Sequence, residues 1–211
     1  MNSVFFSIAL SLDGYMVPKD MDFAHAENFA EQPWFRQWSA LTQWIFRQCF
    51  FREMLRIGEG GETGRDNALL ESVFARTGAS IMGKRMFDGG ERSWPEEAPF
   101  HTAVFVVTHE VRDPWIRPGG TTFYFVNDGI ESALRQAREA AGDRDVRIGG
   151  GPTLVQQYLR AGLVDEIMLS VAPVLFGDGQ RLFDGTGTLP ITLTETIAST
   201  DVTHLRYTVN G

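Results

Sequence analysis

The sequence predicts an α/β fold built around a mostly parallel β-sheet, and three observations support this prediction. Short, nearly continuous apolar segments, such as residues 4–10 and 103–107, are typical of strands covered on both faces. These segments alternate with segments of helical spacing, which is the order that produces a parallel sheet. Residues 191–198 and 204–209 instead alternate apolar and polar side chains, and this pattern predicts an antiparallel pair of strands at the C-terminal edge.

The composition is that of one globular domain, here residues 1–211. Of the 211 residues, 43% are hydrophobic and 22% are charged, so a core is expected and general disorder is not. The net charge of −8 argues against binding to nucleic acid or to a membrane of acidic lipid. The single Cys49 excludes an internal disulfide. With no signal-peptide pattern and no apolar run of transmembrane length, we expect a soluble cytoplasmic protein.

The first predicted strand, residues 4–10, ends in a turn. The sequence Ser11-Leu12-Asp13-Gly14 follows it, and Asp-Gly is a turn signal. Such a turn either brings backbone to a ligand or simply reverses the chain.

Aromatic residues gather in an insertion at about residues 21–64. Five of its side chains recur at helical spacing: Trp34, Trp38, Leu41, Ile45 and Cys49. They predict one amphipathic helix from residue 33 to about residue 57. Its apolar stripe either packs against the core or a partner subunit, or covers a pocket for a flat substrate. The glycine-rich residues 58–64 predict a mobile loop or lid.

The middle of the chain predicts further strands and helices. Asp66 or Asn67 is suited to cap a helix, and Gly78 is suited to end it. A short strand at residues 79–82 leads into Gly83-Lys84-Arg85, a turn with two cations that suits a phosphate group.

The strand at residues 103–107 ends at Thr108-His109, where a phosphate partner and an ordinary surface histidine are alternatives. Residues 121–126 predict the next strand. Asp128, with Glu131 three residues later, predicts the capping box of the helix that follows.

The central motif is a strand, three glycines and a helix. Residues 145–148 form the predicted strand, and Pro152 has the fixed φ that suits the first position of a helix. Between them, Gly149, Gly150 and Gly151 let a ligand approach the backbone, and the N–H groups of the helix favour an anion such as pyrophosphate. A loose connection between strand and helix is the alternative.

Three predicted turns follow strands of the same sheet: Gly83-Lys84-Arg85, Thr108-His109 and Gly149-Gly150-Gly151. Open α/β sheets bind ligands at the carboxyl ends of their strands. We therefore expect the three turns to lie at one edge and to hold an extended, multiply phosphorylated cofactor. The four histidines lack the spacing of metal ligands, so no metal site is expected.

In this order, the motifs resemble the dihydrofolate reductase fold family, and more closely the reductase domain of the bifunctional riboflavin-biosynthesis deaminase/reductase and its stand-alone relatives. The resemblance covers residues 1–20 and about 66–211. It rests on Ser11-Leu12-Asp13-Gly14, Ile81-Met82-Gly83-Lys84-Arg85, Val106-Val107-Thr108, the glycine motif at 148–154 and residues 172–179. It implies a three-layer sandwich with a mostly parallel central sheet.

The resemblance also implies NADPH as cofactor and hydride transfer to a small pterin-like or ribosylaminopyrimidine-like heterocycle. By position, the pyrophosphate of NADPH would lie against Gly149, Gly150, Gly151 and Thr153, in a site that includes Gly83 and Leu154. The adenosine 2′-phosphate would lie against Lys84, Arg85, Thr108 and His109. The nicotinamide would lie near Ala9, Leu12 and Gly14.

One departure concerns the acidic residue that folate reductases carry on the helix before the second strand. Asn67 stands at that position, and an amide cannot protonate a pterin. Asp13 and Asp66 are the remaining candidates for a catalytic contact with another substrate. We therefore expect a homodimeric NADPH-dependent reductase, and the alternative is a non-catalytic NADP(H)-binding or regulatory protein with the same fold.

Overall fold

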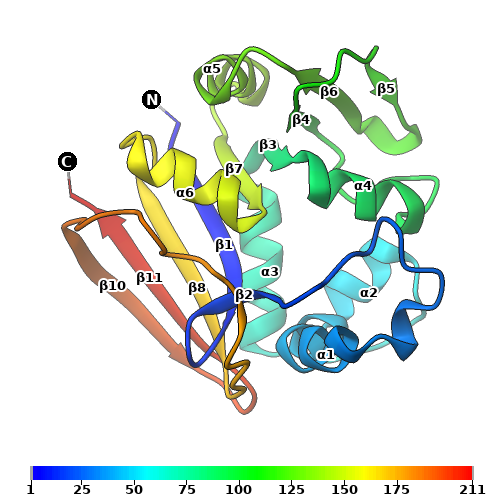
Figure 1. The fold of residues 1–211 in the computed structure, drawn as a ribbon, viewed down its shortest axis with the longest axis vertical. Helices are drawn as coiled ribbons and strands as arrows, with labels where there is room; N and C mark the ends of the chain where they lie inside the picture. Colours follow the sequence, from blue (N-terminus) through cyan, green and yellow to red (C-terminus); the bar gives the residue numbers. More distant parts are fainter. Residues whose placement is uncertain (1, 211) are drawn as a thin grey trace.

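The fold is organised by one nine-stranded sheet in a computed structural model that describes residues 2–210 (Figure 1). The strand order is β10-β11-β8-β1-β7-β3-β4-β6-β5. Its strands are β1 (Val4–Ser11), β3 (Thr77–Gly83), β4 (Ala103–Val107), β5 (Trp115–Ile116), β6 (Thr122–Val126), β7 (Asp145–Gly150), β8 (Glu166–Ala172), β10 (Ile191–Ala198) and β11 (Thr203–Val209). The six strands from β8 to β6 are parallel, and β11 and β10 continue the sheet as an antiparallel edge. The predicted α/β architecture is thus confirmed.

Helices cover both faces of this sheet and make the three layers. They are α1 (Pro33–Phe46), α2 (Cys49–Leu55), α3 (Arg65–Arg76), α4 (Lys84–Ser93), α5 (Ile130–Ala141) and α6 (Pro152–Arg160), with short 3-10 turns η1 (Phe29–Glu31) and η2 (Pro118–Gly120). Helices α5 and α6 pack with Phe6 and Ile8 of β1, whereas α3 packs on Phe5, whose side chain points to the opposite face. A separate two-stranded sheet pairs β2 (Tyr15–Pro18) with β9 (Gly179–Arg181).

The helix predicted from residue 33 to about 57 is wrong as a single element, because the chain breaks between α1 and α2. The backbone N–H of Cys49 donates to the carbonyl oxygen of Glu62 at 2.9 Å instead of continuing the helix. The amide of Glu62 in turn donates to the carbonyl of Arg47 at 2.8 Å. The buried Gln48 side chain ties the break to the carbonyl of Trp44. The glycine-rich loop is therefore anchored to the helices at Glu62.

Three predicted helix ends are also wrong. Helix α3 begins at Arg65, with Gly64 before it, so Asp66 and Asn67 lie in its first turn and cap nothing. Gly78 belongs to β3, where a Cβ would lie 2.6 Å from the carbonyl oxygen of Ala141, so glycine allows α5 to pack closely. Helix α5 is preceded by Gly129 at φ 106°, without a side-chain cap from Asp128.

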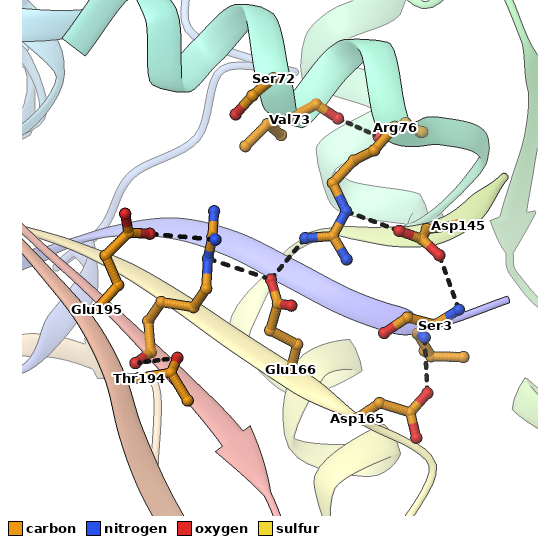
Figure 2. Close-up of polar contacts among 12 residues, drawn as sticks. Ser3, Ser72, Val73, Arg76, Asp145, Asp165, Glu166, Thr194 and Glu195 are labelled. Carbon is orange, nitrogen blue, oxygen red and sulfur yellow. Dashed lines mark hydrogen bonds and ion pairs between the residues drawn. The ribbon is translucent and has the colours of Figure 1, made fainter. Parts of the chain in front are cut away.

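An ion-pair network joins α3 to the amino ends of the strands (Figure 2). Arg76 binds Asp145 through Nε at 2.7 Å and Glu166 through Nη1 at 2.6 Å. Asp145 also accepts the amide of Ser3, and Arg206 binds Glu166 and Glu195. Because Arg76 forms ion pairs with carboxylates from both β7 and β8, the network fixes the last turn of α3 over the central strands.

Replacing Arg76 tests this network. We expect Arg76→Met to lower the free energy of unfolding by about 2–3 kcal/mol, because the partly buried Asp145 loses its counter-ion and Glu166 keeps only the longer contact with Arg206. Urea unfolding followed by circular dichroism measures the change. Lys19→Met is the matched control: it breaks an exposed pair with Asp178 that solvent screens, so its effect should be much smaller than that of Arg76→Met. Equal effects of the two variants would contradict a special role for Arg76.

Candidate functional site

The carboxyl ends of the parallel strands bring the three predicted turns to one edge of the sheet. Strand β7 lies between β1 and β3, and β4 lies on the far side of β3. A Cβ built on Gly83 would lie 3.8 Å from both the carbonyl oxygen of Gly150 and the amide nitrogen of Gly151. Lys84 and Glu110, which follow β3 and β4, form an ion pair at 3.1 Å. The turns are therefore neighbours in space although they lie far apart in the chain.

The glycine loop leads directly into α6. Gly149 and Gly150 end β7, Gly151 precedes the helix, and Pro152 occupies its first position, as predicted. Gly150 has φ 126°, which a residue with a side chain rarely adopts, and the Gly150–Gly151 peptide bond is cis.

The backbone at Gly151 faces open space. A Cβ there would meet no heavy atom within 4 Å, and because Pro152 has no N–H, the amide of Thr153 is the first of α6 and one of those that a helix leaves unpaired. Thr153 is exposed beside this space. Leu154 instead is buried in the core, and its amide donates to Gly151, so its side chain lies away from any ligand above the loop. The loop thus suits a phosphate group at Gly151 and Thr153.

Lys84 and Arg85, the two cations of the turn after β3, already have partners within the protein. Nζ of Lys84 lies 2.6 Å from Oδ1 of Asp88, and this bond, together with Glu110, raises the pKa of Lys84 above its usual range. Arg85 is more exposed and donates to Oε1 of Gln180 at 2.8 Å. An incoming phosphate would therefore reach Lys84 only by displacing carboxylates.

Thr108 and His109 differ in their accessibility. Thr108 is buried, and its hydroxyl accepts the amide of Glu110 at 3.1 Å. His109 is exposed. Of the two, only the His109 side chain is positioned to meet a ligand in solvent.

Asp13 organises the backbone at the ends of β1 and β8. Its carboxylate accepts the hydroxyl of Ser11 at 2.6 Å and the amides of Phe176 and Gly177 at 3.1 and 2.8 Å. Partial burial would raise the pKa of Asp13, but these hydrogen bonds lower it to about 2. Asp13 is consequently ionised at neutral pH, with its acceptors occupied, and has no proton to give.

The residues expected near a nicotinamide lie beside Asp13. Ala9 is half-buried against Tyr15 and Leu41. Leu12 is 66% exposed, and Leu175, which follows β8, is 70% exposed. Two exposed leucines at adjacent strand ends offer an apolar surface that suits a flat ring.

Asp66 belongs to a hydrogen-bonded chain that the sequence did not reveal. Its Oδ1 lies 3.1 Å from Nε2 of His204 and accepts the hydroxyl of Ser199. Nδ1 of His204 lies 2.9 Å from Oγ of Ser170, which is paired with Ala9 across β8 and β1. Burial lowers the pKa of His204, against the opposing effect of Asp66. These hydrogen bonds connect α3, β11 and β8, and no local sequence pattern predicts them.

Asn67 does not join Asp66 in this chain. Its side-chain oxygen accepts the amide of Phe50 at 2.8 Å, and its side-chain nitrogen donates to Glu71. Asn67, which the sequence comparison with folate reductases puts in place of their acidic residue, therefore anchors α2 to α3.

The insertion packs on this same end of the sheet. Leu41 of α1 contacts Tyr15, Ala172 and Phe176, and the Trp44 ring lies 5.0 Å from the His204 ring. The inner side of the aromatic helix therefore covers the strand ends of its own chain. Contact between its outer side and a partner subunit stays a prediction.

Neither a metal-binding group of side chains nor a membrane-spanning helix occurs in the part of the chain that the structure describes. Within residues 2–210, no three or more His, Cys, Asp or Glu side chains gather closely enough to hold a metal ion. Over the same range, none of the helices has the length and apolarity needed to span a membrane.

The His204 chain predicts a pH dependence of stability. Because the folded protein disfavours protonated His204, the unfolded chain takes up that proton more readily as the pH falls below about 6.5. We expect the free energy of unfolding to decrease between pH 7.5 and pH 5.5, and to decrease less in His204→Gln. Urea unfolding at both values measures it. The exposed His109→Gln variant should keep the wild-type dependence, and identical behaviour of both variants would contradict the assignment.

Comparison with known proteins agrees with this geometry. The family model described as RibD C-terminal domain matches residues 2–205. The uncharacterized protein YyaP of Bacillus subtilis (strain 168) is 37% identical over 59 residues, which cover 28% of this chain and 31% of that protein, so the alignment spans under a third of the relative's length.

Two solved structures share the fold over the whole chain. A putative riboflavin biosynthesis protein from Shewanella sp. PV-4 has a TM-score of 0.62 at 20% identity, with 100% of both chains covered. The dihydrofolate reductase of Enterococcus faecalis complexed with NADP(H) has a TM-score of 0.56 at 12% identity, with 99% of this chain and 97% of that chain covered. The chain belongs to the RibD C-terminal domain family and has the dihydrofolate-reductase-like fold.

Proposed function

We propose that this protein is an NADPH-dependent reductase that transfers hydride to a small heterocyclic substrate, pterin-like or ribosylaminopyrimidine-like. The observation that carries the proposal is the glycine loop before α6, with open space above Gly151 at the carboxyl edge of the sheet. Family membership supports it, since RibD C-terminal domains share the reductase fold.

The residues present fit the cofactor at both of its ends. Gly151 and Thr153 would hold the pyrophosphate, because no side chain at Gly151 separates a ligand from the amide of Thr153 at the helix start. Arg85 and His109, with Lys84 after exchange of its carboxylate partners, would hold the 2′-phosphate. When bound, the nicotinamide supplies the hydride, and Ala9, Leu12 and Leu175 would orient the ring and exclude water.

The chain's own contribution to proton transfer centres on Ser170. Ser170 lies in register with Ala9, next to the proposed nicotinamide position. In the neutral imidazole that burial favours, Nε2–H of His204 donates to Asp66, and Nδ1 accepts the hydroxyl of Ser170. These contacts orient Ser170 beside the substrate, and a proton would pass through Oγ of Ser170 only when His204 is protonated at both ring nitrogens. Asp13 has the different task of positioning the loop after β8.

A non-catalytic NADP(H)-binding or regulatory protein is the second candidate. It is favoured by Asn67, which stands where folate reductases are expected to carry their acid, and by the low pKa of Asp13. NADPH that carries deuterium in place of the transferable hydride on its nicotinamide ring distinguishes the two candidates. Deuterium should appear in a reduced pyrimidine or pterin from a substrate panel if the protein is an enzyme, whereas tight NADPH binding without transfer would favour the regulatory candidate.

Gly151→Ala tests the pyrophosphate position. With φ −81° and open space around a Cβ, alanine should leave the free energy of unfolding unchanged, but its methyl group occupies the space of the ligand. We expect NADPH affinity to fall at least tenfold by isothermal titration calorimetry. Gly64→Ala is the control, because its Cβ also meets nothing within 4 Å, and α3 lies away from the loop. Unchanged affinity in Gly151→Ala would place the pyrophosphate elsewhere.

The Lys84→Ala/Arg85→Ala variant tests the preference for NADPH over NADH. Each charged hydrogen bond to the 2′-phosphate contributes about 1.5–3 kcal/mol, so NADPH affinity should fall about tenfold or more, towards that for NADH. NADH affinity should not change, and Arg160→Ala, at the far end of α6, should change neither. If the wild-type protein bound neither nucleotide, the reductase proposal would be abandoned. The proposed homodimer is tested separately by light scattering.

A further inference from the structure

Arg147 is a charged residue in the middle of a central strand. It lies on β7, in register with Phe5 of β1 and Ser80 of β3. Its side chain is on the face covered by α3, and its guanidinium carbon lies 4.7 Å from the centre of the Phe74 ring. Central parallel strands rarely carry such a charge, because both of their faces are covered.

The carboxylates nearest to Arg147 along the sheet are engaged elsewhere. Asp145 lies two residues before it on the same strand and face, but binds Arg76 and the amide of Ser3 (Figure 2). Glu166, in register with Phe5, binds Arg76 and Arg206. The Arg76 network therefore leaves Arg147 without a counter-ion from its neighbouring strands.

Nε of the Arg147 guanidinium has no partner within the described residues. This nitrogen is buried without a hydrogen-bond partner, and among residues 2–210 no ion pair reaches the side chain. Desolvation lowers the pKa of Arg147 to about 10, which leaves it charged at neutral pH. A charge that is even partly removed from water without a partner is costly, and buried donors in proteins are almost always satisfied.

The surroundings are polar and partly open. Ser80 flanks Arg147 on β3, and Ser7 lies two residues beyond Phe5 on the same face of β1. Ser7, Arg147 and Gly149 are half-buried, whereas Ile148, on the opposite face, is fully buried. The α3 face of the sheet is therefore partly accessible to solvent at these residues, whereas the opposite face is closed.

We propose that Arg147 anchors an oxyanion-binding subsite on the α3 face of the sheet, which takes a carboxylate or phosphate group. The planar guanidinium suits bidentate binding of either group, and the serine hydroxyls are additional donors. Arg147 and Gly149 share one face of β7, so this subsite lies on the strand that leads to the glycine loop. Assignment of the oxyanion to the reductase substrate rests on the proposed function, but oxyanion binding itself does not.

The experiment compares wild-type protein with Arg147→Met in thermal unfolding. Sodium phosphate and sodium benzoate are titrated separately, at an ionic strength kept constant with sodium chloride. A ligand of the folded state raises the melting temperature as its concentration exceeds its dissociation constant. We expect at least one of the two anions to raise the wild-type melting temperature, and the rise to be smaller in Arg147→Met, because phosphate can still bind at the proposed cofactor site. The part of the rise that depends on Arg147 reports the subsite: if only phosphate produces it, the subsite takes phosphate, and if only benzoate produces it, the subsite takes a carboxylate.

Arg138→Met is the matched control. Nε of Arg138 is also buried without a partner, but it belongs to α5 on the other face, so this variant should keep the wild-type rise. Arg147→Lys keeps the charge without the planar fork and should show a smaller rise. An equal rise in Arg147→Met and wild type, or no rise in wild type with either anion, would overturn the proposal.

NADPH titration of Arg147→Met separates this proposal from the proposed function. Its NADPH affinity should equal that of the wild-type protein, because the glycine loop is untouched. If the wild type failed to bind NADPH but showed the anion response that depends on Arg147, the reductase proposal would fail and the subsite would stand.

Discussion

The pairing of β7 between β1 and β3 is the constraint on which the rest of this structure depends. Strand β7 follows β3, β4 and β6 in the chain, yet its backbone is hydrogen-bonded to β1 on one side and to β3 on the other. Because β7 lies between β1 and β3, the glycine loop at its end is a neighbour of both the Asp13 turn and the Gly83 turn. It also places Arg147 in the centre of the sheet, and the cofactor proposal and the oxyanion proposal both follow from this one pairing.

Charged side chains at the two ends of the sheet serve different purposes. At the amino ends, Arg76 holds carboxylates from β7 and β8, and these contacts fix α3. At the carboxyl ends, Asp13 accepts backbone amides that shape the loop after β8. The carboxylates at both ends already have partners within the protein. The backbone above Gly151 and Nε of Arg147 instead have no partner among the described residues.

The aromatic segment at residues 21–64 covers part of the carboxyl edge of the sheet. Trp44 and Leu41 cover His204 and Ala172, and Gln37 donates to the carbonyl of Phe176 in the loop that Asp13 positions. The aromatic helix thus contacts both the Asp66–His204–Ser170 chain and the Asp13 loop. We infer that this helix shapes the substrate side of the site, because it covers the strand ends beside the proposed nicotinamide position.

Local sequence determined the features that depend on near neighbours along the chain. Apolar runs placed the parallel strands, alternation placed β10 and β11, and Pro152 marked the start of α6, because these patterns reflect one residue's φ or the faces of one element. Tertiary structure alone decided which side chains meet. The backbone of Glu62 is hydrogen-bonded to Arg47 and Cys49 at the break between α1 and α2. His204 contacts Asp66, which lies 138 positions earlier in the sequence. Arg76 binds Asp145 and Glu166, the carboxylates nearest to Arg147. These contacts follow from strand order and register, which set distances between segments that no local pattern encodes.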